Sequence, residues 1–213
     1  MNSNPLNIGA ATAPRYEFRT FGHNFNKSHE MMMLLTQPVP EDLQVRIFDE
    51  NYIISKTVDD INIKIKNNLL DVKKLVRTKG ITEQWNSVGK YKFPISKEFL
   101  LEEIAPELQV AFTKLEYNEF SIERIADTIK YHKDLLYIPV QKRRYTYVVH
   151  NTICEFAEVV IDNDYLLTIS VESLEYEEVI RTVSQLKLNQ YENINYPQAI
   201  KRVKGINSKS LAN

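Results

Sequence analysis

Several segments of this 213-residue chain alternate polar and apolar side chains with a period of two. The clearest is the segment 61–66 (INIKIK), in which three isoleucines alternate with Asn62, Lys64 and Lys66. Successive side chains of a strand point to opposite faces of its sheet, so this pattern predicts strands with one apolar and one polar face. The chain must therefore fold so that each strand hides one face from water and keeps the other polar.

Strands dominate the secondary structure that we expect. The period-two patterns lie at 15–21, 52–55, 61–66, 69–76, 142–150, 152–161 and 165–172. The pair Asn67-Asn68 between two of them is typical of a tight hairpin turn. Apolar stripes with helical spacing predict helices at 121–131 and 173–188, with weaker signals at 28–36 and 96–103. The predicted class is α+β, rich in antiparallel hairpins with helices between them.

No repeat, low-complexity linker or change of composition divides the chain. We expect a disordered leader at 1–14, a single domain at 15–204 and a disordered tail at 205–213. No stretch approaches the roughly 18 to 20 apolar residues of a membrane span, and the leader lacks the basic and apolar parts of a secretory signal. One cysteine, Cys154, allows no internal disulfide. These features predict a cytoplasmic protein without a membrane partner.

The five glycines exclude two common kinds of phosphate-binding loop. The closest pair, Gly80 and Gly89, is nine positions apart. A P-loop needs glycines five apart, and a dinucleotide-binding loop needs them two and three apart. The four histidines show no metal-binding spacing, and a single cysteine leaves little material for a zinc site. A metal in this protein would therefore be held mainly by carboxylates.

The polar strand faces have two interpretations. A single amphipathic strand most often turns its charges to water, since antiparallel sheets commonly leave one face solvated. Here, however, charged or polar faces recur on many strands, and amphipathic helices are available to cover the apolar faces. The alternative is an eight-stranded antiparallel closed β-barrel with helices packed outside and a polar lumen. Such a barrel has room for one small ligand.

If those polar faces converge, basic side chains would dominate the lumen. Clustered lysines and arginines repel one another, so such a lumen needs an anionic guest, interspersed acids, or both. Phosphate suits this need, since arginine offers it a fork of donors and lysine a point charge. Magnesium typically uses one or two protein carboxylates together with substrate oxygens. The candidate carboxylates are Glu17, Glu155, Glu158 and Glu172.

The order of these segments resembles the CYTH superfamily, the triphosphate tunnel enzymes that include class IV adenylate cyclases and thiamine triphosphatases. The similar segments are RYEFR at 15–19, NIKIK at 62–66, LDVK at 70–73, KRRY at 142–145, CEFAE at 154–158 and SVE at 170–172. Two glutamates of the superfamily's motifs are replaced here, by Arg15 and Ser170. The stretches EFRTF at 17–21 and YENINY at 191–196 also resemble a divergent bacterial subgroup of CYTH-like proteins.

The resemblance implies a tunnel that binds a triphosphate and hydrolyses it with Mg²⁺ or Mn²⁺. Glu17 and Arg144 would be catalytic, and Glu17, Glu158 and Glu172 would hold the metal, with Glu155 left open as an alternative to Glu158. The substrate-binding residues would be Arg15, Arg19, Lys64, Lys66, Lys73, Lys142 and Arg143. Because two acids are missing, a non-catalytic module that binds nucleotide or polyphosphate is the alternative.

Other partners are weakly indicated. The basic run at 142–144 invites a nucleic-acid interpretation, but a formal net charge of -1 gives no broad basic face, so no nucleic acid is expected. Whether the chain forms a homodimer stays open.

Overall fold

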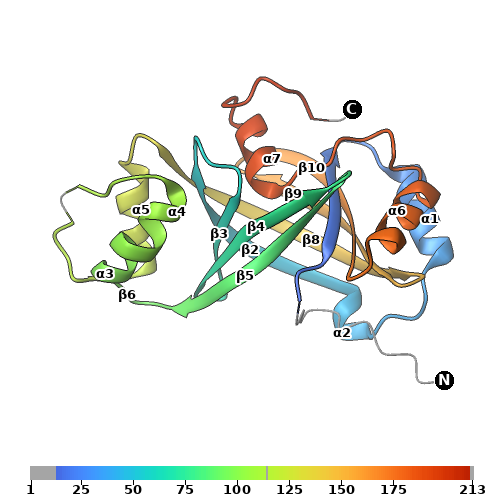
Figure 1. Ribbon diagram of the computed structural model, residues 1–213, viewed down its shortest axis with the longest axis horizontal. Helices are drawn as coiled ribbons and strands as arrows, with labels where there is room; N and C mark the ends of the chain where they lie inside the picture. The colour runs from blue at the N-terminus through green and yellow to red at the C-terminus, as the bar shows by residue number, and fades with distance from the viewer. Residues whose placement is uncertain (1–12, 114, 212–213) are drawn as a thin grey trace.

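Eight antiparallel strands close into a barrel at the centre of the computed structural model, which describes residues 13–113 and 115–211 (Figure 1). Around the barrel the strands follow the order β1-β10-β9-β8-β2-β3-β4-β5. The closed barrel with helices outside and the α+β class are therefore confirmed. Most of the predicted leader, residues 1–12, and the last two residues of the predicted tail lie outside the described residues.

Some strands have the predicted length, and others are longer than the sequence patterns indicated. They are β1 (Tyr16–Gly22), β2 (Val45–Ser55), β3 (Ile61–Lys66), β4 (Leu69–Lys79), β5 (Thr82–Lys92), β8 (Leu135–Val149), β9 (Thr152–Ile161) and β10 (Asp164–Ser173). A separate small sheet pairs β6 (Ile95–Ser96) with β7 (Glu119–Phe120). The first half of β2 and the whole of β5 were missed, because their residues do not alternate cleanly between polar and apolar.

The β3–β4 hairpin turns as predicted. Asn67 and Asn68 have φ angles of 49° and 59°, the left-handed conformation that asparagine tolerates and that two-residue hairpin turns require. The turn fixes the register so that Lys64 lies opposite Asp71. The polar faces of both strands consequently point to the same side of the barrel wall.

Helices cover the outer face of the barrel on two sides (Figure 1). The helical segments are α1 (Asn26–Leu35), α2 (Glu41–Gln44), α3 (Lys97–Phe99), the π-helical segment η1 (Leu100–Ile104), α4 (Ala105–Leu108), α5 (Ile122–Lys130), α6 (Tyr176–Gln185) and α7 (Tyr196–Val203). One apolar core joins α1 and α6 to outward residues such as Phe18 and Ile169. A second joins the α3–α5 region to outward residues such as Ile63 and Leu70. Within the described residues, no helix is long and apolar enough to cross a membrane.

The helix α7 closes one end of the barrel, and we call it the plug helix. Its Tyr196, Ala199 and Ile200 pack in one cluster with inward-facing residues of the wall, and the Tyr196 ring stacks on Tyr52 with 5.4 Å between centroids. The helix begins with a capping box between Asn195 and Gln198, which satisfies backbone donors that would otherwise be unpaired. This helix was not predicted, and among the described residues it covers one end of the lumen.

Candidate functional site

The open half of the lumen holds a cavity of about 690 Å³. Basic side chains outnumber acidic ones in its lining. The charged residues that line it are Arg15, Glu17, Arg46, Lys64, Lys66, Asp71, Lys73, Lys90, Arg144, Glu155 and Glu172. The sequence as a whole has 28 acidic and 27 basic residues, and this near balance conceals a predominantly basic cavity.

Most of the residues that the sequence pointed to meet in or beside this cavity. Those that line it are Arg15, Glu17, Lys64, Lys66, Lys73, Arg144 and Glu172. Arg19 and Lys142 lie deeper, where both contact the Tyr196 ring of the plug helix, with Arg19 Cζ at 5.1 Å and Lys142 Nζ at 3.7 Å from its centroid. Strand alternation explains the convergence, because residues two apart on β1, β3 and β8 share the inner face.

Two predicted residues lie on the outer face, which corrects their expected places. Arg143 is the exposed neighbour of the inward Lys142 and Arg144, and three consecutive strand residues cannot all face one side. Glu158 lies opposite Arg143 in the register, and its oxygens are 3.4 Å from the hydroxyls of Tyr145 and Tyr165. Glu155 takes the lumen position that the sequence left open between it and Glu158.

A buried carboxylate on β2 balances three lysines deep in the lumen. Glu50, whose side chain is 1% exposed, lies 3.0 Å from Lys64 Nζ, 3.1 Å from Lys66 Nζ and 2.5 Å from Lys142 Nζ. Burial raises the pKa of Glu50, but Lys142 and Lys64 lower it by more, so the net pKa lies well below its ordinary value. Burial and the Lys64 charge lower the pKa of Lys142 to about 7, although Glu50 acts in the opposite direction. The single negative charge of Glu50 thus lies beside three lysine amino groups and cannot neutralise all of them.

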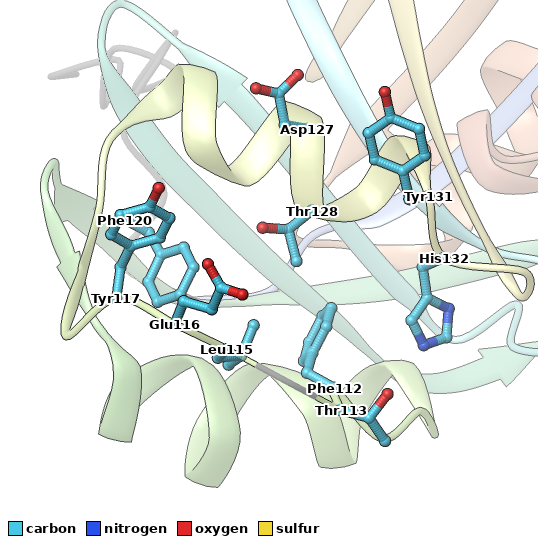
Figure 2. A pocket seen from close by; sticks show the side chains of 10 residues that line it. All are labelled: Phe112, Thr113, Leu115, Glu116, Tyr117, Phe120, Asp127, Thr128, Tyr131 and His132. Carbon is cyan, nitrogen blue, oxygen red and sulfur yellow. The ribbon is translucent and has the colours of Figure 1, made fainter.

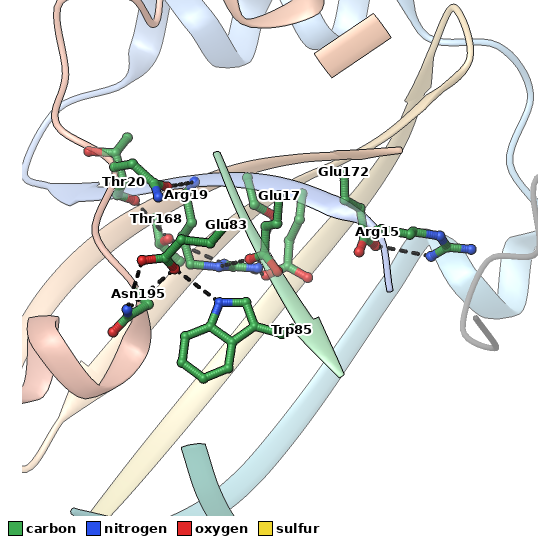
Figure 3. A network of polar contacts seen from close by, with 12 residues as sticks. Arg15, Glu17, Arg19, Thr20, Glu83, Trp85, Thr168, Glu172 and Asn195 are labelled. Carbon is green, nitrogen blue, oxygen red and sulfur yellow. Dashed lines mark hydrogen bonds and ion pairs between the residues drawn. The ribbon is translucent and has the colours of Figure 1, made fainter. Parts of the chain in front are cut away.

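A second network joins β1 to β8, β9 and β10, and Figure 3 labels its members on β1 and β10. Arg19 donates to Glu17 Oε1 at 2.6 Å, to Glu155 Oε1 at 3.0 Å and to Ser170 Oγ at 2.9 Å. Glu155 also pairs with Arg144 at 3.0 Å. Burial raises the pKa of Glu155, but Arg19 and Arg144 lower it by more, to about 2. The carboxylate is therefore ionised at neutral pH and fixes both guanidinium groups.

Glu17 and Glu172 are direct partners in the β1–β10 register, and both face the cavity. Arg15 Nη1 lies 3.4 Å from Glu172 Oε1. The pKa of Glu172 is raised, first by removal from water and then by the Glu17 carboxylate, against the influence of Arg15. A carboxylate whose pKa is raised by a neighbouring carboxylate also favours a cation that the two can share.

The residues present fit a single divalent ion better than a larger cluster. Among residues 13–113 and 115–211, no group of three or more His, Cys, Asp or Glu side chains could hold a metal. Magnesium needs only one or two carboxylates when substrate phosphates complete its coordination. The Glu17–Glu172 pair meets that requirement if Arg15 and Arg19 give up some of their contacts with these two carboxylates.

Several lumen residues escaped the sequence analysis. Arg46, Glu50 and Lys90 lie on strand segments that were not predicted, and only the completed alternation of β2 and β5 reveals them. In the described part of the chain, no carboxylate forms an ion pair with Arg46, Lys73 or Lys90. The rim of the cavity therefore carries basic side chains that no described carboxylate holds in an ion pair.

A smaller hollow of about 280 Å³ lies outside the barrel, beside α5 (Figure 2). Its described lining includes aromatic side chains such as Phe112 and Tyr131 and the carboxylates of Glu116 and Asp127. No lysine or arginine is among these described lining residues. The described lining is therefore aromatic and acidic, in contrast to that of the lumen.

No known family profile and no curated protein match the sequence. Among solved structures, a candidate adenylate cyclase from Bacillus halodurans is similar with a TM-score of 0.47 and 12% identity, over 86% of this chain and 95% of that chain. A Hippeastrum protein described as having a dominant triphosphatase activity has a TM-score of 0.45 and 13% identity, over 90% and 96%.

A Mimivirus capping enzyme triphosphatase is also similar, with a TM-score of 0.44 and 10% identity, over 84% of this chain and 92% of that chain. Each of these descriptions belongs to its own protein. The closed eight-stranded barrel of this chain is established by its own strand pairings.

Proposed function

We propose that the open half of the lumen binds a triphosphate or another polyphosphate, as the CYTH resemblance implies. One observation carries this proposal: Lys64, Lys66, Lys73 and Arg144, from three different strands, converge on one cavity that is closed at its far end. Such a concentration of cations in a confined space is costly unless an anion enters it. A flexible chain of phosphates supplies several negative charges along one line.

The walls offer two kinds of support to such a ligand. Glu155 fixes Arg144 through its 3.0 Å ion pair, so the guanidinium is oriented before the ligand arrives, and preorganised donors lose less entropy on binding. Lys64 and Lys66 can exchange Glu50 for phosphate oxygens, because both line the cavity and both reach Glu50. Lys73 and Lys90 add charge near the rim.

We also propose that the bound polyphosphate is hydrolysed with Mg²⁺ or Mn²⁺. Glu17 and Glu172 would hold the ion, which supplies polarisation of a phosphoryl group when it is bound. Arg144, fixed by Glu155, would stabilise the charge that develops on the leaving phosphate. Closure of the far end by α7 would limit access of bulk water to the deep side of the site.

The test is release of phosphate from inorganic tripolyphosphate with Mg²⁺ or Mn²⁺. We expect turnover by the wild type, and a loss of at least a hundredfold in Glu17→Gln. Glu158→Gln is the matched control, because Glu158 lies on the outer face of the wall and should keep full activity. Failure of the wild type to turn over any triphosphate would refute the enzymatic part of the proposal.

The second candidate is a binding module without metal chemistry. It is favoured by the contacts of the carboxylates, since Arg19 binds Glu17 at 2.6 Å and Arg15 lies 3.4 Å from Glu172. An internal arginine on each glutamate could replace the metal. Thermal unfolding with tripolyphosphate in excess EDTA separates the candidates: a binding module is stabilised without metal and shows no phosphate release when metal is added.

A further inference from the structure

The outer face of strands β2, β8, β9 and β10 carries a group of large side chains that point away from the lumen. In the antiparallel register Ile47 lies beside Arg143, and Arg143 lies beside Glu158. These three therefore form one row across neighbouring strands. Ile47 is 73% exposed, and Tyr165 on β10 is 55% exposed. We call this surface the outer patch, and its residues are Val45, Ile47, Arg143, Tyr145, Glu158 and Tyr165.

The two charged residues of the outer patch do not neutralise each other within the chain. The oxygens of Glu158 lie 3.4 Å from the hydroxyls of Tyr145 and Tyr165. The Arg143 guanidinium lies over the Tyr145 ring instead, with Cζ 5.6 Å from the ring centroid. Among the residues that the structure describes, no carboxylate forms an ion pair with Arg143 and no basic group forms one with Glu158. Two opposite charges thus stand side by side, each without an ionic partner in the described chain.

The composition of the outer patch is typical of a protein interface. Tyrosine and arginine are enriched at interfaces and carry much of the binding energy there. Burial of the exposed Ile47 side chain would remove apolar surface from water, which favours association. The lumen residues lie on the opposite face of the same strands. A partner on the outer patch would therefore leave the cavity accessible.

We infer that the outer patch binds the outer patch of a second copy of this chain, which gives a dimer with two-fold symmetry. Such an interface uses the same surface twice, so that surface must be complementary to itself. Arg143 and Glu158 meet this condition. A two-fold axis that runs parallel to the strands, between β8 and β9, places each Arg143 opposite Glu158 of the other copy. The same rotation places β2, with Ile47, opposite β10 of the other copy, which carries Tyr165.

Charge complementarity favours a second copy as the occupant. Each chain supplies one charge of each sign to the row, so two chains form two ion pairs between them and leave neither charge over. Opposite charges across an interface also fix the register of the two partners. Because the barrel wall is curved, the contact is confined to the outer patch, and we expect a weak dimer that dissociates on dilution. This inference does not depend on the proposed function.

Sedimentation velocity of the full chain, at concentrations from roughly 1 to 200 µM, tests the inference. We expect wild type to approach twice the monomer mass as its concentration rises. Arg143→Glu and Glu158→Arg should each weaken dimerisation at least tenfold, because each places like charges opposite one another at both contacts. An equimolar mixture of these two variants should regain an affinity within threefold of wild type, since its mixed dimer pairs opposite charges at both contacts.

Two control variants separate the outer patch from the general surface. Ile47→Thr, which keeps a β-branched side chain, should weaken dimerisation at least fivefold. Ile81→Thr is the matched control, because Ile81 is an exposed isoleucine in the turn between β4 and β5, and it should dimerise like wild type. Lys133→Glu reverses an exposed charge outside the barrel and should also leave the dimer unchanged.

A wild type that stays monomeric over the whole concentration range would overturn the inference. A dimer that Ile47→Thr and Arg143→Glu leave unchanged would place the interface elsewhere and overturn it as well. If the mixture of Arg143→Glu and Glu158→Arg associates no better than its components, the two residues do not pair across the interface. Circular dichroism of each variant confirms that the compared proteins are folded. Release of phosphate from tripolyphosphate should be equal in all of them, because the lumen lies within one chain, so a lack of turnover bears on the proposed function alone.

Discussion

Replacing Glu50 by glutamine should change stability and anion binding in opposite directions. In the wild type, Glu50 neutralises part of the charge on Lys64, Lys66 and Lys142, at distances of 3.0, 3.1 and 2.5 Å. Glutamine keeps the shape of the side chain and removes its charge. Without this internal partner, Lys64 and Lys66 repel each other, and the pKa of Lys142, already lowered to about 7, falls further, so that Lys142 loses its proton at neutral pH.

The size of the effect follows from how far each lysine can reach water. The side chains of Lys64 and Lys66 are 15% and 22% exposed and line the cavity, so they can turn toward solvent. Lys142 is 7% exposed and remains beside the uncharged site. Breaking a buried ion pair by removing one partner costs about 3 to 5 kcal/mol. Because only one of the three lysines is trapped, we expect the lower end, about 3 kcal/mol.

Binding should respond in the opposite direction. Removal of one negative charge near the ligand and release of Lys64 and Lys66 should strengthen tripolyphosphate binding by about tenfold, or ~1.4 kcal/mol. Urea unfolding measures the stability, and calorimetric titration in EDTA measures the affinity. Asp49→Asn is the matched control, because Asp49 is the adjacent exposed residue of β2. If Glu50→Gln unfolds at the same urea concentration as Asp49→Asn, or binds the anion more weakly than wild type, then Glu50 is not the internal counter-ion of the lumen.

Two further predictions concern the walls of the barrel. Because the pKa of Glu155 is lowered to about 2 from an ordinary 4.5, its ionised form contributes about 3 kcal/mol that is present above pH 4.5 and lost as the pH falls toward 2. Urea unfolding between pH 7 and pH 2.5 should therefore show a shallower decline in Glu155→Gln than in wild type, and parallel curves would contradict this. Asn195→Ala should cost about 2 kcal/mol, since it removes the cap of α7 and the amide that donates to the buried Glu83 at 3.1 Å. A urea midpoint equal to that of wild type would show that the link between the plug helix and β5 is not stabilising.

The barrel could be predicted from sequence where one strand face is polar and the other is covered by helices. The segment 61–66 is the clearest case, because its isoleucines pack under the α3–α5 region and its lysines face the lumen. Strand β9 is the opposite case. Phe156 packs outside against α1 and α6, and Ala157 packs inside near the plug helix, so both faces are apolar and hydropathy does not indicate the orientation of Glu155 or Glu158.

The sequence also could not show which residues of a basic run face the lumen. The triplet 142–144 must place either its middle or its outer residues in the lumen, and only the pairing of β8 with β2 and β9 decides which. Arg46 and Glu50 were missed because the inner face of β2 mixes charged, aromatic and aliphatic residues along one strand. The signal for α7 was present in the Asn195–Gln198 spacing with Pro197 in the first turn, which is typical of a helix start.

The most direct measurement of the central claim is calorimetric titration of tripolyphosphate in EDTA into wild type and into the double variant Lys73→Ala/Lys90→Ala. Both lysines line the cavity, and no described carboxylate forms an ion pair with either, so their removal should leave the fold intact. The double variant Lys130→Ala/Lys133→Ala removes the same charge from an exposed surface outside the barrel. We expect saturable binding by wild type and by the surface variant, and at least tenfold weaker binding by the lumen variant. Absence of binding by wild type, or equal affinities of the two double variants, would contradict the assignment of the lumen as a polyphosphate site.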